Sequence, residues 1–200
     1  MAAITRRTLI LAAAAAGLTG CDRKPADAAE FKAIDITGAT YADALSLTDT
    51  DGKPRTLADF KGKVAVVFFG YTQCPDVCPT TLVELAEVRK ALGAQGDRVQ
   101  GVFVTVDPER DTPQVLKAYV DNFGAGFVAL RGSDEQTKAA AKAFKVFYAK
   151  VPGRDGASYS VDHTAGSYVI DAQGKPRLFV RYGSGAAALQ HDLQLLLAQG

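Results

Sequence analysis

The chain has 200 residues, of which 48% are hydrophobic and 22% charged, and its formal net charge is +1. This is ordinary globular composition, sufficient for one domain with a hydrophobic core. The balanced charge and the lack of a basic cluster argue against a nucleic-acid partner.

The first twenty residues have the layout of an export signal. Arg6 and Arg7 precede an apolar stretch over residues 9–18. That stretch is too short to span a hydrocarbon core, which needs roughly 20 apolar residues. The ending "LTGC" resembles a bacterial lipobox, which predicts cleavage after residue 20 and acylation of the Cys21 sulfur. A plain secretory signal, or a tail anchored without cleavage, is the alternative.

Removal of residues 1–20 changes the inventory of reactive side chains. The remaining chain has 21 basic and 22 acidic residues, a net charge of −1, and no methionine. If Cys21 carries lipid, the free thiols are Cys74 and Cys78, and the imidazoles are His163 and His191. An exported thiol pair meets an oxidising compartment, where it tends to form a disulfide unless it is reduced or binds a metal.

Residues 21–30 read as a short polar tether, and residues 31–200 as one domain. Hydrophobic periodicity and turn signals predict its elements. In chain order these are a hairpin in 44–63, a buried strand over 64–70, a helix over 81–92, a buried strand over 99–106, a helix over 112–123, a short strand over 127–130, a helix over 133–146, a hairpin of 166–171 with 177–182, and a last helix over roughly 186–198. Strands that alternate with helices and end in a hairpin predict a mixed sheet with helices on both faces.

The stretch "FGYTQCPDVCPT" (69–80) lies at the carboxyl end of a predicted central strand and leads into a helix. Positions i and i+4 of a helix project the same way, so Cys74 and Cys78 can form a disulfide, act as a redox pair or converge on one metal ion. The spacing alone does not decide between these. An inert disulfide is the weakest reading, because it gains little by closing so short a loop.

The redox and metal readings differ in what else must approach the cysteines. A thioredoxin-type dithiol has two residues between its cysteines, whereas three lie between Cys74 and Cys78. A metal site needs a third donor. His191 is expected to be a solvated residue of the last helix. A lone histidine such as His163 is usually structural, but in a thioredoxin-like architecture the loop that contains it, Asp162-His163-Thr164, packs against the cysteine turn.

Two thiolates and one imidazole are soft to borderline donors. They suit Cu(I) in a trigonal site, and Cu(II) if a further oxygen ligand is added. Zinc is compatible with the same donors and a fourth ligand.

Three stretches, "FFGYTQCPDVCPTTL", "TVDPERDTP" and "VDHTAGSYVID", in this order and spacing, resemble the Sco/SenC family of copper-binding, membrane-tethered, thioredoxin-like proteins. The resemblance covers essentially all of residues 31–200. It implies an α/β thioredoxin-like fold, with a central mixed sheet, helices on both faces and an N-terminal hairpin. It also implies that Cys74, Cys78 and His163 are the copper ligands.

The resemblance further implies a role in assembling the binuclear copper site of cytochrome c oxidase, by delivering copper or by reducing the cysteines of that site. The expected partners are the copper-site subunit of the oxidase and other copper chaperones or thiol reductants. Family members are usually tethered by a transmembrane helix, and this chain is expected to use lipid at Cys21 instead. The expected location is the outer face of the bacterial cytoplasmic membrane, facing the periplasm.

The favoured hypothesis is therefore a non-enzymatic metallochaperone whose dithiol, Cys74 and Cys78, can also be oxidised reversibly. The rival is an enzyme, a thiol–disulfide oxidoreductase in which bound metal is incidental. His163 discriminates the two, because copper binding requires it and dithiol exchange does not. A peroxidase is disfavoured, because the residues before Cys74 lack the proline and threonine that such enzymes place near the reactive thiol.

Other polar residues near these motifs have simpler interpretations. In "DPERDTP" (107–113), Asp107 and Pro108 are expected to end a strand, while Thr112 and Pro113 start a helix. Asp76 and Asp162 flank the candidate ligands, where they can hydrogen-bond to those ligands or cap loops, and neither is expected to bind the metal.

Overall fold

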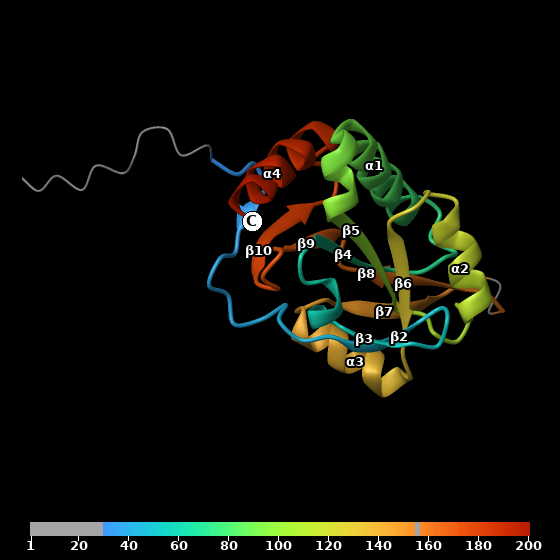
Figure 1. Ribbon diagram of the computed structural model, residues 1–200. Helices are drawn as coiled ribbons and strands as arrows, with labels where there is room; N and C mark the ends of the chain where they lie inside the picture. Colours follow the sequence, from blue (N-terminus) through green and yellow to red (C-terminus); the bar gives the residue numbers. More distant parts are fainter. Residues whose placement is uncertain (1–29, 155–156) are drawn as a thin grey trace, which may run out of the picture. The chain divides into compact units, whose positions relative to one another are not determined.

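Strand β4 (Val64–Gly70) lies in the middle of the main sheet, and all seven of its residues are buried. Its run of β-branched and aromatic residues suits a strand covered on both faces. The computed structural model describes residues 30–154 and 157–200 (Figure 1). The predicted signal, Cys21 and the tether up to residue 29 lie outside the described residues.

Within the described residues, the main sheet has eight strands in the order β1-β10-β9-β4-β5-β6-β2-β3. Strands β4, β5 and β6 run parallel, and the neighbours on either side run antiparallel. The other strands are β1 (Ile34–Asp35), β2 (Ser46–Asp49), β3 (Pro54–Thr56), β5 (Val99–Thr105), β6 (Phe127–Arg131), β9 (Gly166–Ile170) and β10 (Pro176–Arg181). This is the predicted mixed sheet, and the predicted N-terminal hairpin is β2 with β3.

Helices cover both faces of the sheet, as predicted (Figure 1). Helices α1 (Val77–Ala91) and α4 (Ala186–Gln199) pack on the face that Val64 and Val66 point to. Helix α2 (Pro113–Asp121) lies on the same face of the sheet, since its Tyr119 packs on Phe103 of β5. Helix α3 (Asp134–Ala143) lies on the opposite face, where Phe69 contacts Phe144 at its carboxyl end. The described residues also include two 3-10 segments, η1 (Leu57–Phe60) and η2 (Gly93–Arg98).

The structure differs from the sequence prediction in two places near the cysteines and His163. Helix α1 begins at Val77, before the predicted start at residue 81, so Cys78 is its second residue. Pro79 is tolerated there because the first-turn N–H groups have no partner within the helix. His163 does not lie in a loop. It is the last residue of β8 (Tyr159–His163), which pairs with β7 (Tyr148–Pro152) in a separate sheet of two described strands.

Residues 31–200 form one compact unit. Among the described helices, none combines the length and the apolar character that a membrane crossing requires.

Candidate metal centre

The turn after β4 brings Cys74 to the amino end of α1. The Cys74 N–H donates to the Tyr71 carbonyl at 3.2 Å, which closes the turn directly after the strand. Asp76 precedes the helix, and its carbonyl accepts from the Thr80 N–H at 3.1 Å. The cysteine stretch follows a central strand and leads into a helix, as predicted, with Cys74 in the turn and Cys78 in the first turn of α1. Both thiols therefore lie at the carboxyl edge of the parallel strands, where open α/β sheets usually place their ligands.

Gly70, the last residue of β4, leaves room for the second sulfur. A Cβ atom at this position would lie 2.7 Å from Cys78 Sγ, 2.9 Å from Phe68 Cε1 and 3.0 Å from Phe103 Cε2. Real Cβ atoms do not approach other atoms this closely, so no side chain fits without displacing the sulfur or the two rings. The close approach of Cys78 to the sheet thus depends on glycine.

The two cysteines are free thiols in different environments. Cys78 is fully buried, and burial raises the pKa of its thiol well above the usual range. Cys74 is half-buried, and its Sγ accepts a hydrogen bond from the Cys78 N–H at 3.4 Å. Because Cys74 is the more exposed of the two thiols, it is the better placed to meet a ligand or a partner sulfur from outside.

His163 brings the third donor to the cysteines. Its Nε2 lies 3.4 Å from Cys78 Sγ, and its Nδ1 lies 3.2 Å from the Thr164 carbonyl oxygen. A carbonyl oxygen only accepts, so Nδ1 carries the proton and the Nε2 lone pair faces the sulfur. Burial lowers the pKa of the imidazole, which favours this neutral form. Neutral imidazole is the form that binds metals.

Two aromatic side chains fix the ring of His163. Phe68 and Tyr71 meet it edge-to-face, with ring centroids 5.7 Å and 6.0 Å away. Sequence reasoning missed both residues. Phe68 was part of a buried strand, and Tyr71 belongs to the cysteine stretch, but nothing in the sequence says which buried ring touches the histidine.

The three predicted residues thus come together in space. One ligand atom from each of Cys74, Cys78 and His163 lies within 4.8 Å of the others. Within the described ranges, this is the group of three cysteine, histidine or acidic residues that could hold a metal ion. Its two sulfurs and one imidazole fit a soft or borderline metal, and hard cations that prefer oxygen fit it poorly.

The remaining polar residues singled out in the sequence lie outside this group. His191 bonds to the neighbouring Asp192 through Nδ1 at 3.0 Å, with 38% of its side chain exposed, as expected for a partly solvated helix residue. Asp76 accepts from the Thr80 and Tyr182 hydroxyls at 3.4 Å. Asp162 points away from the core, since it is exposed.

Comparisons of this chain with a family profile, with curated relatives and with solved structures point to the same family. Residues 35–198 match the sequence profile of a family described as SCO1/SenC. A SCO2-like protein of Rickettsia felis is 42% identical over 132 residues, which are 66% of this chain and 64% of that protein. The match therefore spans just under two thirds of that relative's length.

Solved structures agree with this result. The structure of Bradyrhizobium japonicum ScoI with copper bound is 38% identical, covers 79% of this chain and 99% of its own, and gives a TM-score of 0.71. A SCO1/SenC family lipoprotein of Bacillus anthracis is 26% identical, covers 84% of this chain and 99% of its own, and gives a TM-score of 0.66. The thioredoxin-like fold expected from the sequence is confirmed.

Proposed function

Since the chain belongs to the SCO1/SenC family, we propose that it is a copper-binding chaperone that serves in assembly of the binuclear copper site of cytochrome c oxidase. The observation that supports this most directly is the convergence of Cys74, Cys78 and His163, with ligand atoms within 4.8 Å of one another. A similar chain, ScoI of Bradyrhizobium japonicum, has a structure with copper bound. The oxidase as recipient follows from the family resemblance.

The proposed roles of the three residues follow from their environments. Cys74 and Cys78 supply thiolates, and His163 supplies a neutral imidazole through Nε2. Burial raises the pKa of Cys78, so this thiol gives up its proton only when a metal or another cation compensates the buried charge. The Cys78 side chain is therefore suited to closing the site once metal arrives, whereas the half-buried Cys74 is suited to making the first contact.

The same dithiol supports a second candidate function, the reduction of cysteines in the recipient. The specific observation is the unequal exposure of the thiols, with an accessible Cys74 and a buried Cys78. Thiol exchange requires an accessible attacking sulfur and a second sulfur that resolves the mixed disulfide. Copper delivery and thiol reduction share these two sulfurs, so oxidation of the pair should abolish metal binding.

We also propose that the chain is exported and anchored by lipid at Cys21, on the periplasmic face of the cytoplasmic membrane. The lipobox-like "LTGC" and the name of the Bacillus anthracis relative, a lipoprotein, support this. Residues 1–20 would be the signal, 21–30 the tether and 31–200 the copper-binding domain. Its partners would be the oxidase subunit and the chaperones or reductants that serve it.

The test is a Cu(I) titration of the reduced protein from Ala29 onward, against a chromophoric chelator. His163→Ala and Cys74→Ser are compared with wild type. We expect both variants to bind Cu(I) at least tenfold more weakly, about 1.4 kcal/mol each. Copper binding as a function fails if wild type binds no tighter than Cys74→Ser. Equal binding by His163→Ala and wild type would exclude the three-ligand site even where copper binds.

A further inference from the structure

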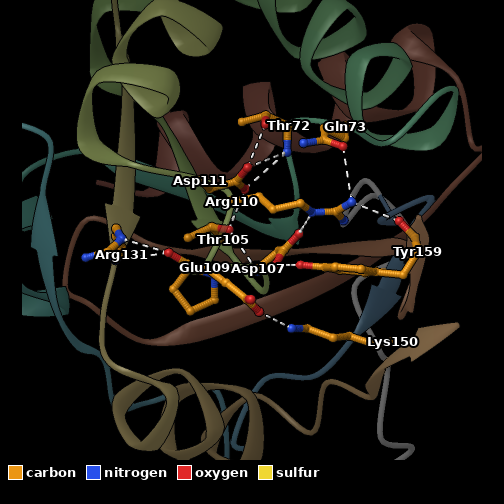
Figure 2. A network of polar contacts seen from close by, with 11 residues as sticks. Thr72, Gln73, Thr105, Asp107, Glu109, Arg110, Asp111, Arg131, Lys150 and Tyr159 are labelled. Carbon is orange, nitrogen blue, oxygen red and sulfur yellow. Dashed lines mark hydrogen bonds and ion pairs between the residues drawn. The ribbon is translucent and has the colours of Figure 1, made fainter. Parts of the chain in front are cut away.

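Two acidic residues of the segment 107–111, Asp107 and Asp111, are buried more deeply than a turn requires. The prediction that Thr112 begins a helix is right, since its hydroxyl accepts from the Val115 N–H at 3.3 Å. That account leaves Asp107 and Asp111 unexplained, because these carboxyl side chains are 1% and 0% exposed. Buried carboxylates are rare unless they are paired or hydrogen-bonded. Figure 2 shows what these residues hold.

Asp111 fixes the turn that leads to the first cysteine. Its carboxylate accepts from the Thr72 hydroxyl at 2.6 Å, from the Thr72 N–H at 3.1 Å and from the Thr105 hydroxyl at 2.6 Å. Thr72 lies two residues before Cys74, and Thr105 ends β5. The backbone before the dithiol is therefore attached to the neighbouring parallel strand through one buried side chain.

Arg110 joins the same turn to strand β8 (Figure 2). Its Nη1 donates to the Gln73 side-chain oxygen at 3.1 Å and to the Tyr159 carbonyl at 2.8 Å. Its Nε donates to Asp107, which in turn accepts from the Tyr159 hydroxyl at 2.9 Å. The guanidinium carbon also lies 3.6 Å from the centre of the Tyr159 ring. Gln73 directly precedes Cys74, so one guanidinium contacts both elements.

Strand β8 carries this contact to the third donor. Tyr159 is its first residue and His163 its last, a span of roughly 13 Å in an extended strand. Because β8 pairs only with β7 among the described strands, the backbone bonds of the main sheet do not hold its Tyr159 end. Arg110 supplies an attachment there, close to the cysteine turn.

A second contact runs through aromatic packing. The Arg110 guanidinium lies 5.7 Å from the centre of the Tyr71 ring, and that ring meets His163 edge-to-face at 6.0 Å. A change at Arg110 therefore reaches the imidazole both along β8 and across Tyr71.

We propose that Arg110 is a positioning residue for the dithiol–imidazole group: its planar fork holds the turn before Cys74 and the strand that ends in His163 at a fixed separation. The importance of this separation for copper rests on the proposed function. Lysine keeps the charge but not the fork, and its compact ammonium cannot reproduce the bonds to Gln73, Asp107 and Tyr159 in one geometry. The variant Arg110→Lys should therefore release β8 without removing a charge.

The first test needs no copper. Because His163 lies between the rings of Phe68 and Tyr71, ring currents make the NMR signals of its imidazole a measure of its position. In the reduced, metal-free protein we expect these signals to move toward those of an exposed histidine in Arg110→Lys. Arg131→Lys is the matched control, because Arg131 donates to the Pro108 carbonyl at 3.0 Å and so contacts the same segment from β6, with no bond to the cysteine turn or β8.

Tyr159→Phe provides a milder variant if Arg110→Lys does not fold. It removes the hydroxyl bond to Asp107 and keeps the ring, so the His163 signals should move in the same direction by less. Unmoved His163 signals in folded Arg110→Lys, or equal movement in Arg131→Lys, overturn the proposal.

The second test is a double-mutant cycle on Cu(I) affinity. Arg110→Lys should weaken binding about tenfold when His163 is present and have little effect in the His163→Ala background. An equal loss in both backgrounds contradicts positioning of His163. Failure of wild type to bind Cu(I) would refute the proposed function, whereas the NMR comparison decides the positioning role independently.

Discussion

Gly70→Ala is the sharpest perturbation of the candidate site that leaves its three donors in place. The added methyl carbon would lie 2.7 Å from Cys78 Sγ, between the rings of Phe68 and Phe103. Non-bonded heavy atoms prefer about 3.5–4.0 Å, so the sulfur or the backbone beneath it must move by roughly 1 Å. Cys78 is fully buried, and His163 Nε2 lies 3.4 Å from its sulfur, so a displaced sulfur moves relative to the imidazole.

The expected magnitude follows from that displacement. Overpacking of a core by a methyl group typically costs about 1–3 kcal/mol of unfolding free energy. Ligands must be held within about 0.5 Å of their productive geometry, so a shift of roughly 1 Å should also weaken Cu(I) binding at least about tenfold. Both effects belong to one steric contact, and stability and affinity should fall together.

The assay measures urea unfolding and Cu(I) competition on wild type, Gly70→Ala and Gly101→Ala. The last is a matched control, because its Cβ would lie 2.4 Å from Phe127 Cδ1 in the same sheet. Gly101 is four residues before Thr105, which pairs with Gly70, so it lies roughly 13 Å farther along β5. We expect both variants to lose stability and Gly70→Ala alone to lose copper affinity. Wild-type affinity in Gly70→Ala, or an equal loss in Gly101→Ala, would refute the reasoning.

Three further predictions concern other groups. Asp192→Ala removes the buried carboxylate that accepts from the Lys32 and Ala33 N–H groups at 2.8 Å. Urea unfolding should show a loss of about 1–3 kcal/mol in unfolding free energy, with Cu(I) affinity unchanged. A loss of Cu(I) affinity would contradict this prediction. Burial lowers the pKa of His163, so the unfolded chain takes up this proton at a higher pH than the folded protein, and stability should fall as the pH drops below about 6.5. In urea titrations, His163→Gln should lose less stability than wild type between pH 7.5 and 5.5. An equal loss in both proteins contradicts a lowered pKa of His163. The Tyr119 hydroxyl is buried and has no hydrogen-bond partner among the described residues, so Tyr119→Phe should leave stability unchanged or raise it by up to about 3 kcal/mol, and a lower urea midpoint would reveal a partner.

Most of the secondary structure was predictable from local patterns, and the exceptions have physical causes. The strand over 64–70 was predicted with its observed bounds, because a short continuous run of β-branched and aromatic residues is typical of a buried strand. The predicted start of α1 at residue 81 was wrong. The helix begins at Val77 and includes Pro79, since a proline in the first turn breaks no helical hydrogen bond. The β7–β8 hairpin was not predicted. Val161 is the one buried residue of these two strands, so the hairpin lacks the continuous apolar run that marks the core strands.

The structural interpretation of "DPERDTP" was correct for Thr112 and incomplete for the residues before it. Local reasoning identified a strand end and a helix start, which the structure shows. It could not reveal that Asp111 reaches Thr72 or that Arg110 reaches Tyr159, because these partners are 39 and 49 residues away. Buried polar networks depend on which segments the fold places side by side.

By itself, the sequence determined the chemistry of the candidate site. It has two thiols four residues apart, directly after a predicted buried strand, and few other soft donors in the chain. The tertiary structure decided how those donors meet. His163 is 85 residues from Cys78, and only the antiparallel placement of β9 beside β4 brings the preceding β8 to the cysteines. Burial then raises the pKa of Cys78 and lowers that of His163, because desolvation disfavours the charged form of each group. Desolvation is a property of the packed interior, so no reading of residue types alone could supply it.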